Sequence, residues 1–371
     1  MASPPSRSHA IDVMRGMTVA LMIVVNMSIS ERYSYAQLLH SSWDGYTLTD
    51  VVFPTFLFVV GTALAFTLGR LQAEGTGRLL LKVGKRTVLL ALIGFLLSWL
   101  PYLSVDAAGH LALAAVDQAR IPGVLQRIAI GYGSAALILH FFKARGAVVF
   151  SVAALLGYWA VLLTCGDLTL TGNAVVKLDL LVFGPGHLYH GEGVPFDPEG
   201  LLSTLPAIVN TIAGYFAGRV VIVKGATYEA LATLLTAGSV ALGVALAWSG
   251  VLPFNKKLWT PSYALCSIGI DVIVLALLVY LIDLRGRRGW ARFFEVFGRN
   301  ALFIYLLAEL GMIILGRVTW GGHSGLEGLY FNVFRPLAGD KPGSLLFSLS
   351  YMLACWAVAW WLDRRRIYVR L

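Results

Sequence analysis

The stretch LLHSSWDGYTLTDVVFPTFLFVVG, residues 38–61, decides which class of protein this chain belongs to. Its C-terminal part is an apolar run that begins a membrane span, whereas His40, Asp44 and Asp50 lie before this run or at its start. Ionisable side chains at membrane depth are energetically costly, so they are functional candidates by default. Asn26 ends the preceding apolar run, fourteen residues before His40. We therefore expect a functional site that begins with Asn26 and His40.

The composition of the whole chain is that of a membrane protein. The chain has 371 residues, of which 58% are hydrophobic and only 13% are charged, whereas a soluble domain has about 25% charged residues. Ten apolar runs are long enough to cross a bilayer, and they lie near 11–28, 50–70, 84–103, 121–142, 147–165, 201–221, 229–251, 260–282, 296–316 and 345–362. The sequence predicts an all-α polytopic transmembrane helix bundle of about ten spans, organised as a single domain over residues 1–371.

The positive charges predict how this bundle is oriented. Lysine and arginine concentrate in alternate connections and at the C-terminal end, near 70–86, 143–145, 219–224, 285–292 and 364–366. Positively charged loops stay in the cytoplasm, so both termini are expected there. Two cytoplasmic termini require an even number of spans, and ten spans satisfy that condition.

The connection at about 166–200 differs from the other outer connections. It is rich in glycine and proline and carries histidines and carboxylates. Long loops of this kind are usually functional or disordered, and its aromatic and charged residues favour an ordered cap over the outer face. Its His187 and His190 have no third histidine or cysteine nearby, so we predict no metal site.

His40 is the first candidate for chemistry. An imidazole titrates near neutral pH, so it can accept a proton from an attacking nucleophile or itself attack an acyl group. The side-chain amide of Asn26 can donate to a developing oxyanion. The alternative for His40 is an interfacial histidine that packs and hydrogen-bonds without taking part in chemistry.

Three further residues of the same stretch are expected to support His40. A carboxylate from Asp44 or Asp50 can orient the imidazole and stabilise its charged form, and Trp43 stands beside them. The alternative for Asp50 is a helix N-terminal cap formed with Thr47 or Thr49.

Other polar residues at span mouths are candidates for substrate binding. Gln126 and Arg127 lie about one turn inside the fourth span, where an arginine can bind a phosphate or sugar hydroxyls. Glu199 precedes the sixth span, and Asn255 and Lys256 lie in a polar segment on the side where positive charge is rare. The alternatives are a snorkelling Arg127, a carboxylate that complements the helix dipole, and lysines that mark the membrane interface.

Six segments of the chain together resemble one known family. They are IDVMRGMTVALMIVVN (residues 11–26), the stretch 38–61 quoted above, RIPGVLQRIAIGY, FDPEGLLSTLPAIVNTIAGYFAG, LPFNKKLWTPSYAL and FGRNALFIYLLAEL. They resemble the heparan-α-glucosaminide N-acetyltransferase family and its bacterial relatives, from about residue 8 to the C-terminus. The resemblance implies a transmembrane acyltransferase that uses cytosolic acetyl-CoA to acetylate an amino sugar at the opposite face.

The resemblance also implies roles for individual residues. His40 matches the proposed active-site histidine of the family, and Asn26 matches its partner asparagine. Asp44 stands where the lysosomal enzyme has asparagine in its Trp-Asn-Gly motif, which leaves the hydrogen-bonding role of that position open. Separately from the resemblance, cationic side chains near the cytoplasmic face can hold the coenzyme phosphates, and we expect Arg86, Arg285 and Arg288 in this role.

The expected activity is N-acetylation of glucosamine or a related amino sugar at the periplasmic side of a bacterial cytoplasmic membrane. Two alternatives stay open: O-acetylation of a cell-envelope glycan, and a sugar or anion transporter with no covalent step. The expected partners are acetyl-CoA, as a co-substrate, the amino sugar and membrane lipid. No metal and no nucleic acid are expected, and a homodimer is one assembly state left open.

Overall fold

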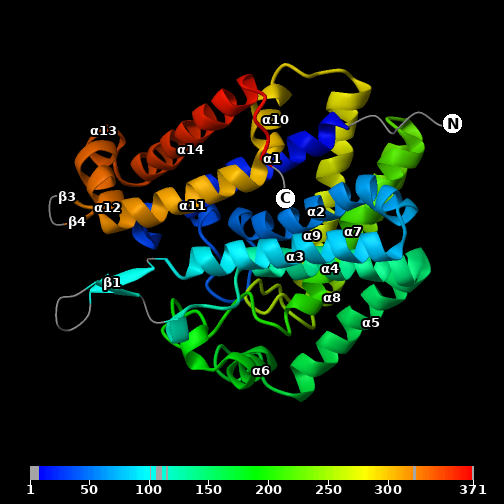
Figure 1. The fold of residues 1–371 in the computed structure, drawn as a ribbon, viewed down its shortest axis with the longest axis horizontal. Coiled ribbons are helices and arrows are strands. Elements are labelled where there is room, and N and C mark those ends of the chain that lie inside the picture. Colours follow the sequence, from blue (N-terminus) through cyan, green and yellow to red (C-terminus); the bar gives the residue numbers. More distant parts are fainter. Residues whose placement is uncertain (1–7, 101, 106–110, 114–115, 321–322, 370–371) are drawn as a thin grey trace. The chain divides into compact units, whose positions relative to one another are not determined.

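The computed structural model describes residues 8–100, 102–105, 111–113, 116–320 and 323–369, and most of them are helical (Figure 1). The strands in this part form two short antiparallel hairpins, β1 (Leu103–Val105) with β2 (Leu111–Leu113) and β3 (Thr319–Trp320) with β4 (His323–Ser324). The predicted all-α class is therefore confirmed.

Among the described residues, eight helices are long and apolar enough to cross a membrane. They are α1 (His9–Asn26), α2 (Leu48–Ala73), α4 (Val124–Phe141), α5 (Lys143–Thr164), α7 (Thr204–Lys224), α8 (Tyr228–Ser249), α9 (Pro261–Leu278, continued by a π-helical segment to Leu284) and α14 (Asp340–Arg364). A ninth is counted if the bent pair α10 (Ala291–Arg299) and α11 (Ala301–Arg317) is one span. The chain is thus a polytopic membrane protein.

The predicted run at 84–103 falls on α3 (Thr76–Ser98). This helix has the length of a span, at 23 residues, but it carries Lys82, Lys85 and Arg86 in its first half. Nine of the ten predicted runs therefore fall on one helix each, and the run at 296–316 falls on the pair α10 and α11; α3 is not among the helices apolar enough to cross a membrane.

The predicted run at 296–316 is not straight, because α10 and α11 meet at an angle of 83°. Asn300 separates them with non-helical backbone angles (φ −125°, ψ 34°). Its side chain donates to the Ile367 carbonyl and accepts from the Val369 amide, both at 2.9 Å. Sharp helix kinks have local causes, and here the asparagine interrupts the helix and ties it to the chain's last described residues.

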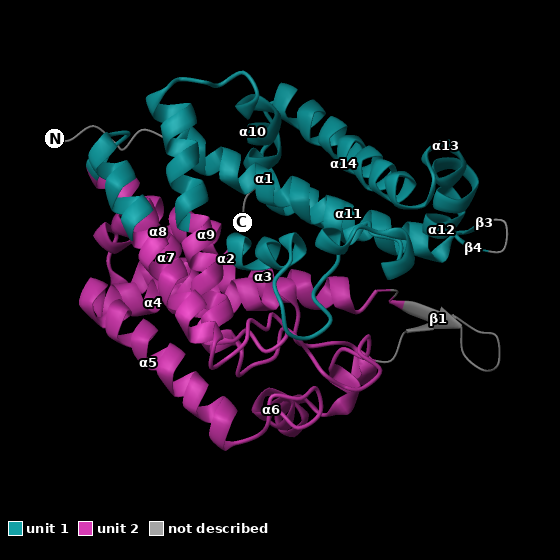
Figure 2. Cartoon of the chain, turned by 180° about the vertical axis from the view of Figure 1, so that it is seen from behind, with its two compact units in different colours: residues 1–56, 224–236, 272–371 teal, residues 57–223, 237–271 magenta. Residues whose placement is uncertain are grey.

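The chain forms two compact units, which are described separately (Figure 2). The first contains residues 1–56, 224–236 and 272–371. Within it α1 packs against α10, α11 and α14. At Gly16 an added Cβ atom would lie 1.8 Å from the Phe294 carbonyl oxygen, so glycine lets the backbones of α1 and α10 touch.

Short helices complete the first unit. They are the 3₁₀ turns Glu31–Tyr33 and Ala36–Leu38, α12 (Gly325–Leu329), a π-helical segment Tyr330–Phe334, and α13 (Arg335–Ala338). The two 3₁₀ turns lie in the connection between α1 and α2, which also contains His40.

The second unit contains residues 57–223 and 237–271. Its apolar core is formed by Leu64, Leu68, Leu79, Val83, Tyr132, Ala135, Ala136, Leu139, Ala147, Ile208 and Ile212. The shorter helices α6 (Ala174–Phe183), Val116–Gln118 and Pro185–His187 lie in its connections.

Glycines bring α2 and α7 together in this second unit. A Cβ atom at Gly61 would lie 1.9 Å from the Thr211 carbonyl oxygen, and one at Gly214 would lie 1.9 Å from the Phe58 carbonyl oxygen. Gly214 and Gly218 form a Gly-x-x-x-Gly pattern, which permits close helix approach in membranes.

Substituting Gly214 with alanine should destabilise the second unit, because the methyl group overlaps the α2 backbone and forces the helices apart. Overpacking of this kind typically costs about 1–3 kcal/mol. We expect a melting temperature several degrees below that of the wild type in detergent. Gly243→Ala is the matched control, since nothing lies within 4 Å of a Cβ atom there. Equal melting temperatures for the two variants would contradict the tight α2–α7 contact.

Candidate functional site

His40 and Asp50 form a hydrogen-bonded pair at the start of α2. Asp50 is the third residue of the helix and is 0% exposed. The His40 Nδ1 atom lies 2.7 Å from the Asp50 Oδ1 atom. The other carboxylate oxygen, Oδ2, accepts from the Ser41 amide at 3.2 Å and from the Thr47 amide and hydroxyl at 3.0 Å each. Asp50 therefore caps the helix and binds the histidine at the same time.

This geometry assigns the tautomer of His40. An ionised carboxylate only accepts hydrogen bonds, so the facing Nδ1 atom carries the proton. In the neutral ring the lone pair then lies on Nε2. The His40 side chain is 45% exposed, while its partner is buried. A buried carboxylate behind a histidine is an arrangement that orients the imidazole and stabilises its protonated form.

The connection that carries His40 is tied to the first turn of α2. The Thr47 hydroxyl donates to the Leu39 carbonyl at 2.8 Å, and the Thr49 hydroxyl donates to the Gln37 carbonyl at 3.1 Å. These bonds hold the segment before His40 against the helix that supplies Asp50. Because they fix the backbone just before His40, they restrict the position of the imidazole in addition to the bond to Asp50.

Trp43 and Asp44 lie in the bend between His40 and α2. Trp43 is half-buried and Asp44 is exposed. Gly45 follows them with φ at +136°, a region that side-chain-bearing residues rarely adopt. The Trp-Asp-Gly sequence therefore makes the turn that returns the chain from His40 to Thr47.

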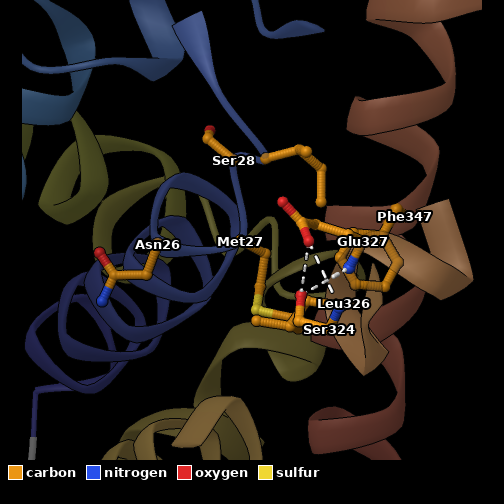
Figure 3. Close-up of a pocket in the computed structure, with 8 residues that line it drawn as sticks. Asn26, Met27, Ser28, Ser324, Leu326, Glu327 and Phe347 are labelled. Atoms are coloured by element: carbon orange, nitrogen blue, oxygen red, sulfur yellow. Dashed lines mark hydrogen bonds between the residues drawn. The ribbon is translucent and has the colours of Figure 1, made fainter. Parts of the chain in front are cut away.

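Asn26 is the last residue of α1, and its Nδ2 atom donates to the Glu309 Oε1 atom of α11 at 3.0 Å. It lines a cavity of about 240 Å³ together with Met27, Ser28, Ile29, Ser324, Leu326, Glu327 and Phe347. Figure 3 shows Glu327 and Ser324 bonded to each other, with the Asn26 side chain on the far side of Met27 and directed away from them.

The chain between Asn26 and His40 links the two candidates. The Ser28 hydroxyl, in the wall of the cavity, donates to the Leu38 carbonyl at 3.0 Å. Leu38 precedes His40 by two residues, a backbone distance of about 7 Å in extended chain. One wall of the cavity is thus anchored to the segment that carries the histidine.

In the second unit, Arg120 holds two carboxylates. Its Nε and Nη2 atoms contact the Asp197 oxygens at 2.8 and 2.7 Å, and Nη2 also contacts Glu199. The guanidinium carbon lies 4.9 Å from the Tyr189 ring centroid. Burial by itself would lower the pKa of Arg120, but the bond to Asp197 and the charge of Glu199 raise it above its ordinary value.

Glu199 lies among several positive charges. Burial favours a higher pKa for its carboxyl, but the charges of Arg120, Lys256 and Arg127 lower the pKa below its ordinary value. Two of the predicted substrate-binding residues, Arg127 and Lys256, therefore act electrostatically on a third, Glu199. Glu199 does not cap the sixth predicted span, since α7 begins at Thr204.

Arg127 is 1% exposed, so the snorkelling alternative is wrong. Its Nη2 atom donates to the Gly200 carbonyl at 3.0 Å and to the Ser203 hydroxyl at 2.5 Å. The guanidinium carbon lies 4.8 Å from the Trp259 ring, and the indole Nε1 of Trp259 donates to Asn210 at 3.1 Å. The residue is a buried connector between α4 and the segment that leads into α7.

The remaining predicted substrate-binding residues are Asn255 and Gln126. Asn255 is buried, and its Oδ1 atom accepts from the Leu258 amide at 2.8 Å within a turn. Gln126 faces α3, where a Cβ atom at Gly94 would lie 2.4 Å from its Oε1 atom. Asn255 therefore stabilises its own turn, and Gln126 lies against α3.

The arginines assigned to coenzyme phosphates are distributed over both units. The Arg86 guanidinium carbon lies 4.6 Å from the Tyr132 ring in the second unit. Arg285 and Arg288 lie in the first unit, in the exposed connection before α10, and Arg285 is 5.9 Å from the Tyr280 ring.

Sequence reasoning did not assign a site role to Arg120, Asp197, Ser203 or Trp259. Arg120 is the first residue of the quoted RIPGVLQR segment and Asp197 lies in FDPEG, so both stood inside recognised motifs. Their pairing was hidden because 77 residues separate them in sequence.

Asp179 of α6 also makes a polar contact in the second unit. Its Oδ1 atom accepts from the Leu201 amide at 2.9 Å, whereas its Oδ2 atom is buried without a hydrogen-bond partner in the described structure. Burial raises the pKa of this carboxyl from 3.8 to about 6.

Comparison with known proteins identifies related sequences. The family described as heparan-alpha-glucosaminide N-acetyltransferase, catalytic, matches residues 7–246. The heparan-alpha-glucosaminide N-acetyltransferases of Mus musculus and Homo sapiens are each 28% identical to this chain, over 366 and 368 residues. These alignments cover 83% and 84% of this chain and 54% of each relative, so the chain spans about half the length of these curated relatives.

The buried Asp179 carboxyl should make stability fall as the pH rises. In the folded chain the Asp179 carboxyl retains its proton up to about pH 6, whereas in the unfolded chain the same carboxyl loses its proton near pH 3.8. The stabilising contribution is thus complete below about pH 4 and is lost as the pH rises through 6, amounting to about 2–3 kcal/mol. Raising the pH from about 4.5 to 7.5 should lower the melting temperature of the wild type relative to that of Asp179→Asn.

The control for this prediction is Asp167→Asn in the same connection. Hydrogen bonds from Thr169 lower the pKa of Asp167, so its titration has the opposite sign. This variant should retain the loss of stability toward neutral pH. An Asp179→Asn variant whose pH dependence matches that of the wild type would contradict the assignment.

Proposed function

This chain belongs to the heparan-alpha-glucosaminide N-acetyltransferase family, and on that basis we propose that it transfers the acetyl group of acetyl-CoA to the amine of an amino sugar. The acceptor class is glucosamine or a closely related amino sugar. The observation that carries the mechanism is the 2.7 Å contact between His40 Nδ1 and the fully buried Asp50 carboxylate.

The proposed chemistry begins at His40 Nε2. The amine nitrogen of the acceptor attacks the thioester carbonyl, forming the N–C bond, and the C–S bond to coenzyme A breaks. His40 removes the proton from the amine and returns it to the departing thiolate. General-base catalysis of this kind contributes about 10²–10⁴-fold. Asp50 stabilises the imidazolium that forms, and Asn26 donates to the oxyanion on the carbonyl oxygen.

The same pair also suits a two-step route. In that version His40 Nε2 attacks the thioester first, an acetyl-histidine forms with release of coenzyme A, and the amine then takes the acetyl group. Both routes need Nε2 to carry the lone pair, so both depend on the proton that Asp50 holds on Nδ1.

The charge distribution supports a sidedness for the reaction. With both termini in the cytoplasm, the connection that carries His40 lies on the outer side, as do Arg120 and the connection at 166–200. Arg86, Arg285 and Arg288 then lie on the cytoplasmic side, where they can bind the coenzyme phosphates. We infer a bacterial cytoplasmic membrane, with the amino sugar presented from the periplasm and the acetyl group carried toward it.

The charged residues around Glu199 in the second unit support a role in acceptor binding. Arg127, Glu199 and Lys256 supply donors and acceptors suited to sugar hydroxyls, in a region where burial strengthens each contact. The connection at 166–200 contributes Glu192, which accepts from Lys257 at 2.6 Å. We assign this connection as an ordered cap of the single functional domain, residues 1–371.

The proposal is tested by measuring acetyl transfer with purified protein in lipid nanodiscs. The wild type should release coenzyme A thiol from acetyl-CoA in the presence of glucosamine and form N-acetylglucosamine. His40→Ala should reduce the rate by about 10²–10⁴-fold because the base is lost. N-acetylglucosamine, which offers only hydroxyls, should not be an acceptor.

His190→Ala is the matched control, because His190 is an exposed histidine of the connection at 166–200 with no assigned role. Its activity should stay within about twofold of the wild type. Acetylation of hydroxyl acceptors in preference to the amine would replace the proposed reaction with O-acetylation. Full activity of a folded His40→Ala protein would remove His40 from the mechanism.

A further inference from the structure

Glu309 is an ionisable side chain in the middle of α11, which is otherwise apolar over most of its length. We propose that Glu309 is a positioning residue for acetyl transfer, and that its carboxylate fixes the orientation of the Asn26 amide. This inference rests on the proposed function, because the orientation matters only if Asn26 donates to the reacting carbonyl.

The contacts of Glu309 single it out among the carboxylates of the first unit. It is half-buried, and its Oε1 atom accepts from Asn26 Nδ2 at 3.0 Å. Within the described residues no lysine, arginine or histidine lies within ion-pair distance of it. Glu295 of the same unit, in contrast, contacts both His9 and Arg299.

An unpaired carboxylate in a membrane span is costly, and such residues usually mark a functional site. Helix association alone does not require one, because α1 and α10 already pack through glycine. The bond to Asn26 is therefore the observation that accounts for a carboxylate at this position.

The bond has a specific consequence for the amide. The last torsion of an asparagine side chain is roughly two-fold, so the Oδ1 and Nδ2 atoms can exchange places at small cost. In the structure Nδ2 donates to Oε1, and an accepting carboxyl oxygen selects the orientation with Nδ2 toward Glu309. One Nδ2 proton then binds Glu309, and the second proton points away from it.

That second proton is the one that can serve the reaction. Asn26 is exposed at the wall of the 240 Å³ cavity, whose Ser28 anchors the segment leading to His40. With the amide fixed, a donor is presented to a developing oxyanion. With the amide inverted, the Oδ1 atom would face the oxyanion and repel it. Glu309 thus acts through Asn26 and need not touch the substrate.

A purely structural role makes a different prediction. If the bond only joins α1 to α11, its loss lowers stability, and the effects of changing Asn26 and Glu309 on turnover are independent. If Glu309 acts through Asn26, the two effects on kcat are coupled. A double-mutant cycle measures this coupling directly.

The experiment compares Asn26→Ala, Glu309→Leu and the double variant, with kcat and the KM for glucosamine measured at saturating acetyl-CoA in nanodiscs. Asn26→Ala should lower kcat by about 10²–10³-fold, as loss of one oxyanion donor does. Glu309→Leu should lower kcat by about 10–100-fold, the loss typical when residues that orient metal-binding side chains are removed, with little change in KM. The double variant should match Asn26→Ala within about threefold.

Two further variants separate positioning from stability. Glu309→Gln retains an oxygen that can accept from Asn26 but does not select one amide orientation, so its kcat should lie between those of the wild type and Glu309→Leu. Tyr351→Phe removes the hydroxyl that donates to the Ala308 carbonyl at 2.8 Å, beside Glu309. It should lower the melting temperature and leave kcat within about twofold.

The outcomes are distinguishable. A double variant whose loss equals the product of the single losses would overturn the positioning role while leaving the proposed function intact. Equal kcat values for Glu309→Leu and the wild type would also overturn it. A wild-type protein that transfers no acetyl group from acetyl-CoA to glucosamine would overturn the proposed function and, with it, this inference.

Discussion

The buried carboxylate of Asp50 is the interaction on which the rest of the site depends. It accepts from His40 through one oxygen and from Ser41 and Thr47 through the other. A buried charge is tolerated only when hydrogen bonds replace its hydration. The same bonds that satisfy Asp50 start α2, close the loop after α1 and set the histidine tautomer. The hydrogen bonds that fold this segment therefore also fix the orientation and tautomer of the imidazole.

The buried charges of the second unit also need partners that replace their hydration. Arg120 is ion-paired with both Asp197 and Glu199, and Arg127 donates to backbone and hydroxyl oxygens. Removing one partner of such a network leaves a buried charge without compensation. Arg127 lies on α4, and in the same unit α7 approaches α2 closely through Gly214. Close packing reduces side-chain freedom around the polar groups, which favours a fixed arrangement of donors and acceptors.

The apolar runs of the sequence predicted the helices well, because length and hydrophobicity are local properties. The bend between α10 and α11 was not predicted, since it depends on Asn300 bonding to residues 367 and 369. The helix α6 was also not predicted, because its ten residues are too few for a span. Asn173 caps it by accepting from the Val176 amide at 2.8 Å, a signal that was present in the sequence.

The site could be predicted where its partners are neighbours in sequence. His40 and Asp50 are ten residues apart and stand in one motif. Glu309 was missed because its partner Asn26 is 283 residues away, and because α11 was interpreted as an apolar span with no site role. The pairing of Arg120 with Asp197 was hidden in the same way. Long-range polar pairs depend on tertiary packing, which a single sequence does not specify.

The central claim is that Asp50 holds the proton on His40 Nδ1 and leaves Nε2 to carry the lone pair. It is tested most directly by ¹⁵N magnetic resonance of histidine-labelled protein in lipid, with the His40 signals assigned by comparison with His40→Gln. At a pH where the ring is neutral, the account predicts a protonated Nδ1 and an unprotonated Nε2. A neutral His40 ring with its proton on Nε2 would contradict the account.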